Sequence, residues 1–259
     1  MTDAGLDGKQ LAQACGWHPS KVSRISTAKT SPSADDIRVW CQACGADDQT
    51  DDLIASLRAV EGMWVEWRKM ERAGLRQAQE ARLPLYEWTR WFRSLSPGLI
   101  PGLIQTYGYT EDVLRAVQRR RVEIDDVADA VPARMERQRV LYEGYRRFAF
   151  LVEQSTLSNA PGEPDTQQEQ LEHLLTVAAL PNVSLGVVRT RMGRTRMPVE
   201  GFWIYDQAQV NVELVSGYLT ITQPREVAMY ADTFAELADN AVYGAKARAL
   251  IRAAMDSLR

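Results

Sequence analysis

The 259-residue chain has only two histidines and three cysteines, and no apolar run approaches the length of a membrane span. Two histidines leave little material for a serine or cysteine nucleophile with a histidine base. Glycine-rich phosphate loops and the His-Glu-x-x-His motif are absent as well. Because the N-terminus also has no basic and apolar signal-peptide pattern, the sequence predicts a cytoplasmic protein without a membrane partner.

The chain does contain carboxylates that could act as general acids or bases. Their spacing does not place any two of them together, and each could equally be an ion-pair partner or an exposed charge. We therefore expect binding rather than catalysis, assign no catalytic residue and expect no cofactor. These carboxylates are Glu87, Glu153, Asp206 and Glu213.

A zinc site is suggested by Cys15 with His18, and by Cys41 with Cys44, which have metal-ligand spacing. The second pair, however, falls on the apolar positions of a helix expected over residues 34–43. Cysteine is among the most buried residue types, and a reducing cytosol leaves it unpaired. We therefore interpret these cysteines as small core residues and expect no metal.

The net charge of −3 argues against a protein that coats nucleic acid generally, because such binding needs a clear basic excess. Residues 8–30 nevertheless contain four basic and no acidic side chains, whereas aspartates gather between residues 35 and 52. This local asymmetry marks the basic segment as the candidate DNA surface. Its basic residues are Lys9, Lys21, Arg24 and Lys29.

Residues 8–33 have the spacing of a helix-turn-helix. Ala12 is small where the first helix would press on the second, and Gly16 suits the tight turn that ends the first helix. Val22 and Ile25, three residues apart, would share the buried face of the second helix. An ordinary helical hairpin has the same spacing.

The exposed face of the second helix would then carry Ser20, Lys21 and Arg24. These side chains suit a DNA major groove, where arginine can pair bidentately with guanine. With Lys9 and Lys29 they form the predicted DNA-binding set.

The rest of the chain carries several short motifs. They are Glu66-Trp67-Arg68-Lys69-Met70-Glu71-Arg72, Pro84-Leu85-Tyr86-Glu87, Phe92-Arg93, the segment 97–106, Arg134, Arg137 with Gln138, His173-Leu174-Leu175 and Pro181-Asn182-Val183. With these motifs, the chain resembles the large C-terminal domain of many actinobacterial regulators, and residues 8–45 resemble their Xre-type helix-turn-helix. The resemblance implies an antitoxin-like DNA-binding regulator, often encoded beside a small partner protein. It implies a fold more than a mechanism.

Two departures from the Xre-type pattern bear on DNA binding. Only seven residues precede Gly8, so the helix that normally packs under the helix-turn-helix is missing. Ser26-Thr27-Ala28 stand where such domains have Glu-Asn-Gly, and the Cβ of Ala28 disfavours a left-handed turn. Either the start codon has been placed inside the domain, or the helix-turn-helix is kept for packing and its DNA binding has weakened.

We predict an α+β, mostly helical fold, with a helix-turn-helix bundle over residues 1–60, a helical connector over 61–82 and a mixed domain with a small sheet over 83–259. One helical pattern runs from residue 48 to 81, with breaks only at Gly62 and Gly74. In the mixed domain, apolar periodicity and turn residues set the expected elements. Helices are expected at 108–121, 131–142, 166–180, 223–237 and 243–258, and strands at 147–154, 183–189, 201–206, 210–215 and 218–222.

Tyr86, Trp88, Trp91 and Phe92 fall at helical spacing, and the apolar loop 97–105 that follows must be buried. Core packing is one interpretation. The other is a ligand pocket, because such pockets are apolar with a few polar groups. Its residues would be Trp88, Trp91, Gln105, Tyr107 and Tyr109.

Residues 189–196 contain four arginines. Such a run usually forms a solvated loop, but it could also grip phosphate or an acidic partner.

We predict a DNA-binding transcriptional regulator, a homodimer that reads a palindromic site and whose C-terminal domain dimerises or receives a partner protein or small-molecule ligand. The alternative is a repurposed regulator scaffold that binds or converts a small molecule and has lost DNA binding. Without the first helix, we expect parts of Leu11, Val22, Ile25 and Ile37 to need cover from the helix around Leu53, Leu57, Val60 and Trp64, and residues 1–46 alone to be unfolded.

Overall fold

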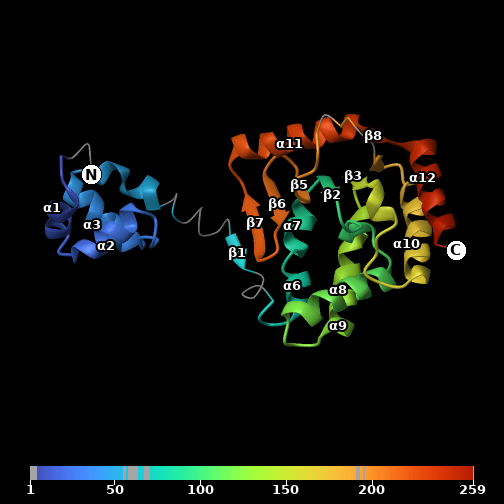
Figure 1. Ribbon diagram of the computed structural model, residues 1–259, viewed down its shortest axis with the longest axis horizontal. Coiled ribbons are helices and arrows are strands. Elements are labelled where there is room, and N and C mark those ends of the chain that lie inside the picture. Colours follow the sequence, from blue (N-terminus) through green and yellow to red (C-terminus); the bar gives the residue numbers. More distant parts are fainter. Residues whose placement is uncertain are drawn as a thin grey trace. The chain divides into compact units, whose positions relative to one another are not determined.

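The computed structural model describes residues 5–54, 57, 64–66, 71–190, 193–194 and 196–258. The chain divides into two compact units, Met1–Met63 and Trp64–Arg259 (Figure 1). Among the described residues, no helix has the length and apolar character needed to span a bilayer.

The first unit is a bundle of short helices whose ends are set by local side chains. Asp7 and Gln10 form a capping box at the start of α1, and His18 caps α2, which begins with a proline. Ser33 and Asp36 form a second capping box, and Gly45 ends α3 in the left-handed conformation. The elements are α1 (Gly8–Ala14), α2 (Pro19–Ser26), α3 (Ala34–Cys44) and the 3₁₀ turn η1 (Asp47–Gln49), followed by helical residues 50–54.

The core of this unit contains Leu11 and Val22, which are 0 % and 1 % exposed. Trp17 and Trp40 pack beside them, with an edge-to-face contact at 6.1 Å between ring centroids. The expectation that Leu11 and Val22 need cover from the helix around Leu53 is therefore wrong, because other side chains of the first unit, among them the two indoles, pack against them.

Ile25 and Ile37 are half-buried and line an apolar groove of about 380 Å³. Leu53 and Leu57 line the same groove, so the segment expected to cover these isoleucines does reach them. Val60 lies outside the described residues.

The second unit is built on a mixed sheet. Among the described residues, eight strands run in the order β1-β7-β6-β5-β2-β3-β4-β8. β2, β3 and β4 are parallel, and the other neighbours are antiparallel. The strands are β1 (Trp64–Glu66), β2 (Trp91–Ser96), β3 (Arg147–Glu153), β4 (Val183–Val188), β5 (Phe202–Tyr205), β6 (Gln209–Glu213), β7 (Gly217–Ile221) and β8 (Ala241–Val242).

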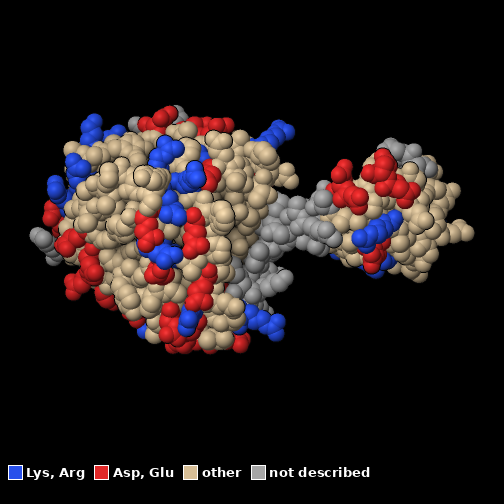
Figure 2. Space-filling model, turned by 180° about the vertical axis from the view of Figure 1, so that it is seen from behind, with Lys and Arg blue, Asp and Glu red and all other residues tan. Residues whose placement is uncertain are grey.

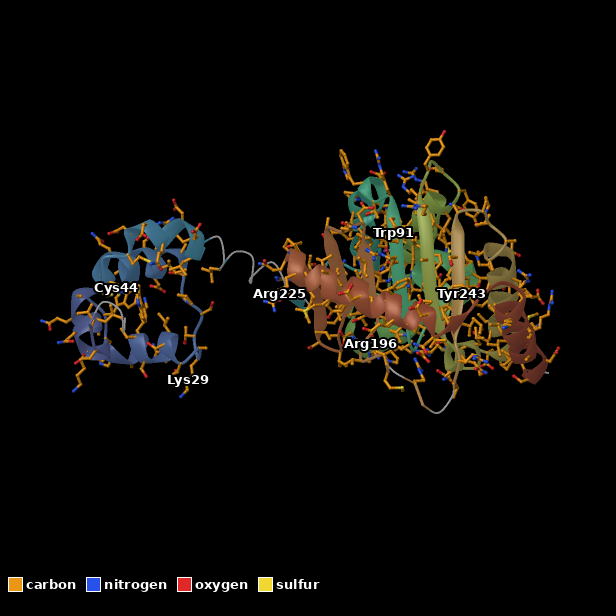
Figure 3. The ribbon with its side chains drawn as sticks, turned by 90° about the horizontal axis from the view of Figure 1, so that it is seen from above. Lys29, Cys44, Trp91, Arg196, Arg225 and Tyr243 are labelled. Atoms are coloured by element: carbon orange, nitrogen blue, oxygen red, sulfur yellow. The ribbon has the colours of Figure 1, made fainter. Side chains whose placement is uncertain are left out.

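Helices cover both faces of this sheet. α11 (Pro224–Asp239) lies across one face (Figure 3), where Tyr230 packs edge-to-face on Phe202 at 5.0 Å. Successive strand residues point to opposite faces, so Trp203 faces the other side. There, α7 (Leu83–Trp88), α10 (Pro164–Val177) and α12 (Gly244–Ser257) bury an aromatic core in which Phe92 stacks on Phe148 at 4.8 Å.

α6 (Leu75–Glu80), α8 (Tyr107–Arg121) and α9 (Val127–Glu136) form a helical layer with its own small core. The Asp126 carboxylate accepts the N–H groups of Leu75 and Arg76 at 2.9 Å and so caps α6. Gly74 is required at this junction: its φ is +100°, and a Cβ there would lie 2.3 Å from Asp126 Oδ2.

Most predicted elements are confirmed within a few residues, but two predictions are wrong. The helical pattern from residue 48 to 81 is interrupted by β1, which pairs with β7. The aromatic run is not one helix, because α7 ends at Trp88 and β2 begins at Trp91. These added strands, with β8, make the sheet larger than expected.

Pairing with distant segments explains why the aromatic run is not one helix. The carboxylate of Asp206 accepts the N–H groups of Arg90 and Trp91, and β2 then pairs with β3 and β5 along its length. Tertiary pairing therefore overrides the helical spacing. The helix expected over 131–142 starts at Val127 and tightens into the 3₁₀ segment η3 (Arg137–Leu141).

Candidate functional site

The exposed side of α2 is the first candidate site. Ser20 and Arg24 are both exposed, and no described carboxylate lies within ion-pair distance of Arg24. The hydroxyl of Ser20 is 2.8 Å from His18 Nδ1, the residue that caps the helix. Arg24 therefore presents an uncompensated guanidinium, whereas Ser20 is already part of the cap.

Lys21 behaves differently from the other predicted DNA-binding residues. Its ammonium group lies 2.6 Å from Asp36 Oδ1 and 4.2 Å from the ring centroid of Trp17. The hydrogen bond from Lys21 is the main reason that the pKa of Asp36 is lowered. Lys21 thus joins α2 to α3, and its ammonium group is paired with a carboxylate of the same unit.

The turn after α2 is formed in spite of Ala28. This residue has φ of +55°, and the N–H of Lys29 donates to the carbonyl of Arg24 at 2.8 Å. The Cβ makes the left-handed conformation costly but does not prevent it. The connection between α2 and α3 is therefore kept without glycine.

Lys9 and Lys29 are exposed, and Lys29 lies at the edge of its unit in Figure 3. A shallow hollow of about 570 Å³ lies between the start of α1 and α2. It is lined by Asp7, Gly8, Lys9, Pro19, Val22, Ser23, Ser26 and Thr27.

The cysteines lie in this unit without forming a described metal centre. Cys41 is buried, and Cys15 and Cys44 are partly buried. Cys15 Sγ donates weakly to the carbonyl of Val39 at 3.9 Å. In the described ranges, no three His, Cys, Asp or Glu side chains are grouped to hold an ion.

The arginine-rich segment 189–196 is only partly a solvated loop. Arg194 is buried and forms a bidentate ion pair with Glu153, at 2.7 and 2.8 Å. Arg196 binds Glu236 at 2.7 Å, and Arg189 is exposed. The segment thus engages carboxylates of its own chain, and Arg191 lies outside the described residues.

The carboxylates considered for acid or base chemistry are separated and engaged. Glu87 binds Arg139 at 3.1 Å, Glu153 binds Arg194, and Asp206 accepts backbone N–H groups at the start of β2. None of these arrangements is an acid–base pair poised on a cavity. The fourth, Glu213, lines the cavity described next.

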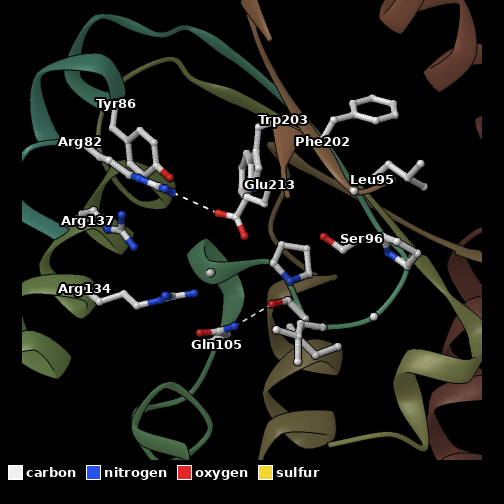
Figure 4. A pocket seen from close by; sticks show the side chains of 17 residues that line it. Arg82, Tyr86, Leu95, Ser96, Gln105, Arg134, Arg137, Phe202, Trp203 and Glu213 are labelled. Atoms are coloured by element: carbon white, nitrogen blue, oxygen red, sulfur yellow. Dashed lines mark hydrogen bonds and ion pairs between the residues drawn. The ribbon is translucent and has the colours of Figure 1, made fainter. Parts of the chain in front are cut away.

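The second candidate site is a cavity of about 230 Å³ between α7, η3, the loop after β2 and strands β5 and β6 (Figure 4). Arg82, Arg134 and Arg137 approach it from one side, and Glu213 and Trp203 lie opposite. Arg82 binds Glu213 at 3.4 Å.

Arg137 is 3 % exposed, and its Nε and Nη1 atoms are buried without a hydrogen-bond partner among the described residues. Its guanidinium carbon lies 5.4 Å from the ring centroid of Tyr86. Nε of Arg134 is also buried and unpartnered. Burial, and then the charges of Arg137 and Arg82, lower the pKa of Arg134 to about 10. Burial likewise lowers the pKa of Arg137.

Comparison with known proteins places most of the second unit in one family. A family model described as a domain of unknown function, DUF5753, matches residues 90–253. The chain belongs to the DUF5753 family. A model described as a helix-turn-helix domain matches residues 1–53, which contain α1, α2 and α3.

A solved structure titled as TrmBL2, an archaeal chromatin protein with a novel mode of DNA binding, is 12 % identical to the chain. The match covers 92 % of this chain and 88 % of that one, with a TM-score of 0.34. No curated protein matches the chain.

The second unit, Trp64–Arg259, which contains the matched residues 90–253, is called the DUF5753 unit below. Within it, the structure brings only one of the predicted ligand residues to the cavity, namely Gln105. Trp88 is 84 % exposed and Tyr107 is half exposed. Tyr109 is fully buried, with its hydroxyl accepting the N–H of Ile100 at 3.3 Å, and Trp91 lies in β2 under the guanidinium of Arg93.

Sequence reasoning missed the arginines as functional residues. Arg134 and Arg137 are three residues apart, which is the one local signal that they share a helical face. Their convergence with Arg82 and Glu213 depends on the packing of the DUF5753 unit.

Proposed function

We propose that this protein is a DNA-binding transcriptional regulator that uses α2 as its recognition helix. The observation that carries the proposal is the exposed Arg24 on α2 of a helix-turn-helix domain, without a described carboxylate to neutralise it. A free guanidinium at this position can pair with a guanine edge in the major groove. Lys9 and Lys29 would contact phosphates.

DNA contact would be confined to the helix-turn-helix unit. The net charge is −3, and Figure 2 shows acidic and basic side chains interspersed over the visible face of the larger unit. Such a surface gives little general attraction to phosphate. Affinity would therefore come from a specific site rather than from coating of the duplex.

We also propose that the protein acts as a homodimer in the cytoplasm. A recognition helix of 8 residues reads only a few base pairs, and a two-fold dimer doubles the site. The DUF5753 unit would supply dimer contacts or receive a signal, either a small partner protein or a small molecule.

The test is selection of bound duplexes from a random library by the full chain, followed by titration of the selected sequence at several salt concentrations. The proposal predicts a palindromic consensus, a protein mass corresponding to two copies in sedimentation, and loss of affinity when the consensus is mutated. Absence of any enriched sequence would overturn it.

A second candidate function is a repurposed scaffold that binds a small molecule without binding DNA. The observation that favours it is the cavity lined by three arginines, which does not depend on the helix-turn-helix unit. In that case the random library would give no consensus, whereas the cavity would still take its ligand.

A further inference from the structure

The cavity in the DUF5753 unit has an excess of positive charge. Its lining contains the guanidinium groups of Arg82, Arg134 and Arg137 but only one carboxylate, Glu213. Glu213 is paired with Arg82, and no carboxylate of the described lining lies within ion-pair distance of Arg134 or Arg137. Attraction to Glu213 raises the pKa of Arg82 although burial opposes it, so Arg82 is held in its charged form.

The two remaining arginines have donors that the described protein does not use. Arg137 has two buried nitrogens without partners, and Arg134 has one. Buried charged donors without acceptors are costly, and burial alone does not explain why two of them are kept together. Because the pKa of Arg134 is about 10, this residue keeps its charge at neutral pH. The two guanidinium groups therefore lack acceptors of the kind that an anion supplies.

The loop that lines the cavity leaves room for Arg134 and is braced by hydrogen bonds. Gly102 lies so close to it that a Cβ there would be 2.8 Å from Arg134 Nη2. Gln138 Nε2 donates to the carbonyls of Gln105 and Gly102, at 2.7 and 3.3 Å, and Gln105 Nε2 donates to that of Ile100 at 2.7 Å. These bonds brace the loop that lines the cavity, so this wall is ordered before a ligand arrives.

The cavity also has aromatic and apolar lining. Tyr86 and Trp203 both line it, with their ring centroids 6.4 Å apart and their planes inclined by 30°. Leu95 in β2, with Pro97 and Leu99 in the loop after it, adds apolar surface. An ion alone would leave this surface without a partner, whereas a ring or short chain attached to the anion would cover it.

We propose that this cavity binds a small organic acid or organic phosphate, whose oxyanion pairs with Arg134 and Arg137 and whose apolar part lies against Tyr86 and Trp203. The proposal deepens the sensing role suggested above for the DUF5753 unit, but it does not require that the chain binds DNA. A carboxylate and a phosphate share the bidentate chemistry that guanidinium groups recognise, and the probes below separate them.

The test is calorimetric titration of the full chain, without DNA, with benzoate, phenyl phosphate, inorganic phosphate and neutral benzamide. The proposal predicts saturable binding of benzoate or phenyl phosphate and none of benzamide. If inorganic phosphate binds as tightly as phenyl phosphate, the apolar half of the proposal is overturned and the oxyanion half is supported. If no anion gives saturable binding, the proposal is overturned as a whole.

Substitutions of the arginines that line the cavity test whether the anion binds there. Arg137→Gln is expected to weaken the anion by about tenfold or more, because it removes a charge-assisted contact. Arg139→Gln is the matched control: it lies two residues along η3, and its side chain is 46 % exposed. Equal binding by wild type and Arg137→Gln would overturn the assignment. If Arg137→Gln does not fold, Arg134→Lys is the second variant, with the same expected loss.

Because these titrations contain no DNA, they fail or succeed independently of the random-library selection. Anion binding without a DNA consensus would leave the cavity assignment in place and remove the regulator proposal. A DNA consensus without anion binding would support the regulator proposal and overturn the cavity assignment.

Discussion

Arg194 and Glu153 form a buried bidentate ion pair, with Nη1–Oε2 and Nη2–Oε1 distances of 2.8 and 2.7 Å. Their side chains are only 6 % and 8 % exposed, so neither charge has water as an alternative partner. The pair joins the arginine-rich segment to the end of β3, where Glu153 is the last residue.

Removing one member of this pair should destabilise the DUF5753 unit strongly. Arg194→Met leaves the Glu153 carboxylate buried and unpaired, for which we expect a loss of about 3 to 5 kcal/mol in the free energy of unfolding. Urea denaturation measures it. Arg196→Met is the control, because its partner Glu236 is 55 % exposed and the change should cost about 1 kcal/mol or less. Equal losses in the two variants would show that burial of the Arg194–Glu153 pair does not increase its contribution to stability.

Lys21 and Asp36 predict a pH dependence in the helix-turn-helix unit. The folded unit lowers the pKa of Asp36 below its ordinary value of 3.8, mainly through the hydrogen bond from Lys21. The bond therefore contributes stability that is complete above pH 3.8 and is lost as the pH falls through the lowered value. The stability difference between wild type and Lys21→Met should shrink over that acidic range. A difference that stays constant down to the lowest pH at which the protein folds would contradict the coupling.

Substituting glycine for Ala28 should raise the stability of the helix-turn-helix unit, whereas the same substitution at a control position should lower it. Ala28→Gly removes the strain of a Cβ at φ +55° and should stabilise the helix-turn-helix unit by about 0.5 to 1 kcal/mol. The same change at Ala14, the exposed last residue of α1, should destabilise it by up to about 1 kcal/mol. Hydrogen exchange of amides in α1 and α2 reports both variants separately from the larger unit. A destabilising Ala28→Gly would mean that the left-handed turn is not kept in solution.

Arg24 and Lys21 should differ in their effect on DNA. Arg24→Ala is expected to lower affinity for the selected duplex by about 1 to 3 kcal/mol and to relax the preference at one base pair. Lys21→Ala should reduce DNA affinity less than Arg24→Ala, since Lys21 is engaged by Asp36. Arg38→Ala, on the exposed side of α3, is the control. Fluorescence titrations against the consensus and a mutated duplex decide between a role in reading bases and no role at all.

Arg137 is expected to lower the stability of the ligand-free protein, because its buried charge lacks hydrogen-bond acceptors. Replacing its unpartnered charge by an apolar side chain of similar length, Arg137→Met, is expected to raise the melting temperature of the ligand-free protein. The bound anion should raise the melting temperature of the wild type but not that of the variant. A lower melting temperature for the ligand-free variant would assign Arg137 a structural role.

The sequence alone determined the elements whose signals lie within a few residues of one another. The turn at Gly16, the cap at Ser33 and the helix over 107–121 follow from residues within one or two helical turns. Strands such as Arg147–Glu153 follow from the alternation and composition of a single run. Arg24 could be placed on the outer face of its helix for the same reason.

Tertiary structure decided what depends on distant partners. Trp91–Ser96 is a strand because Asp206 and two neighbouring strands pair with it, although its spacing with Tyr86 is that of a helix. The ion pair between Lys21 and Asp36 joins two helices and could not be read from the spacing within one of them. The charged cavity needs Arg82, Arg137 and Glu213, which are far apart in the chain and come together through the packing of the larger unit. Capping and periodicity act over one or two turns, whereas the position of a charge relative to a cavity depends on how separate segments pack, and no local pattern encodes that.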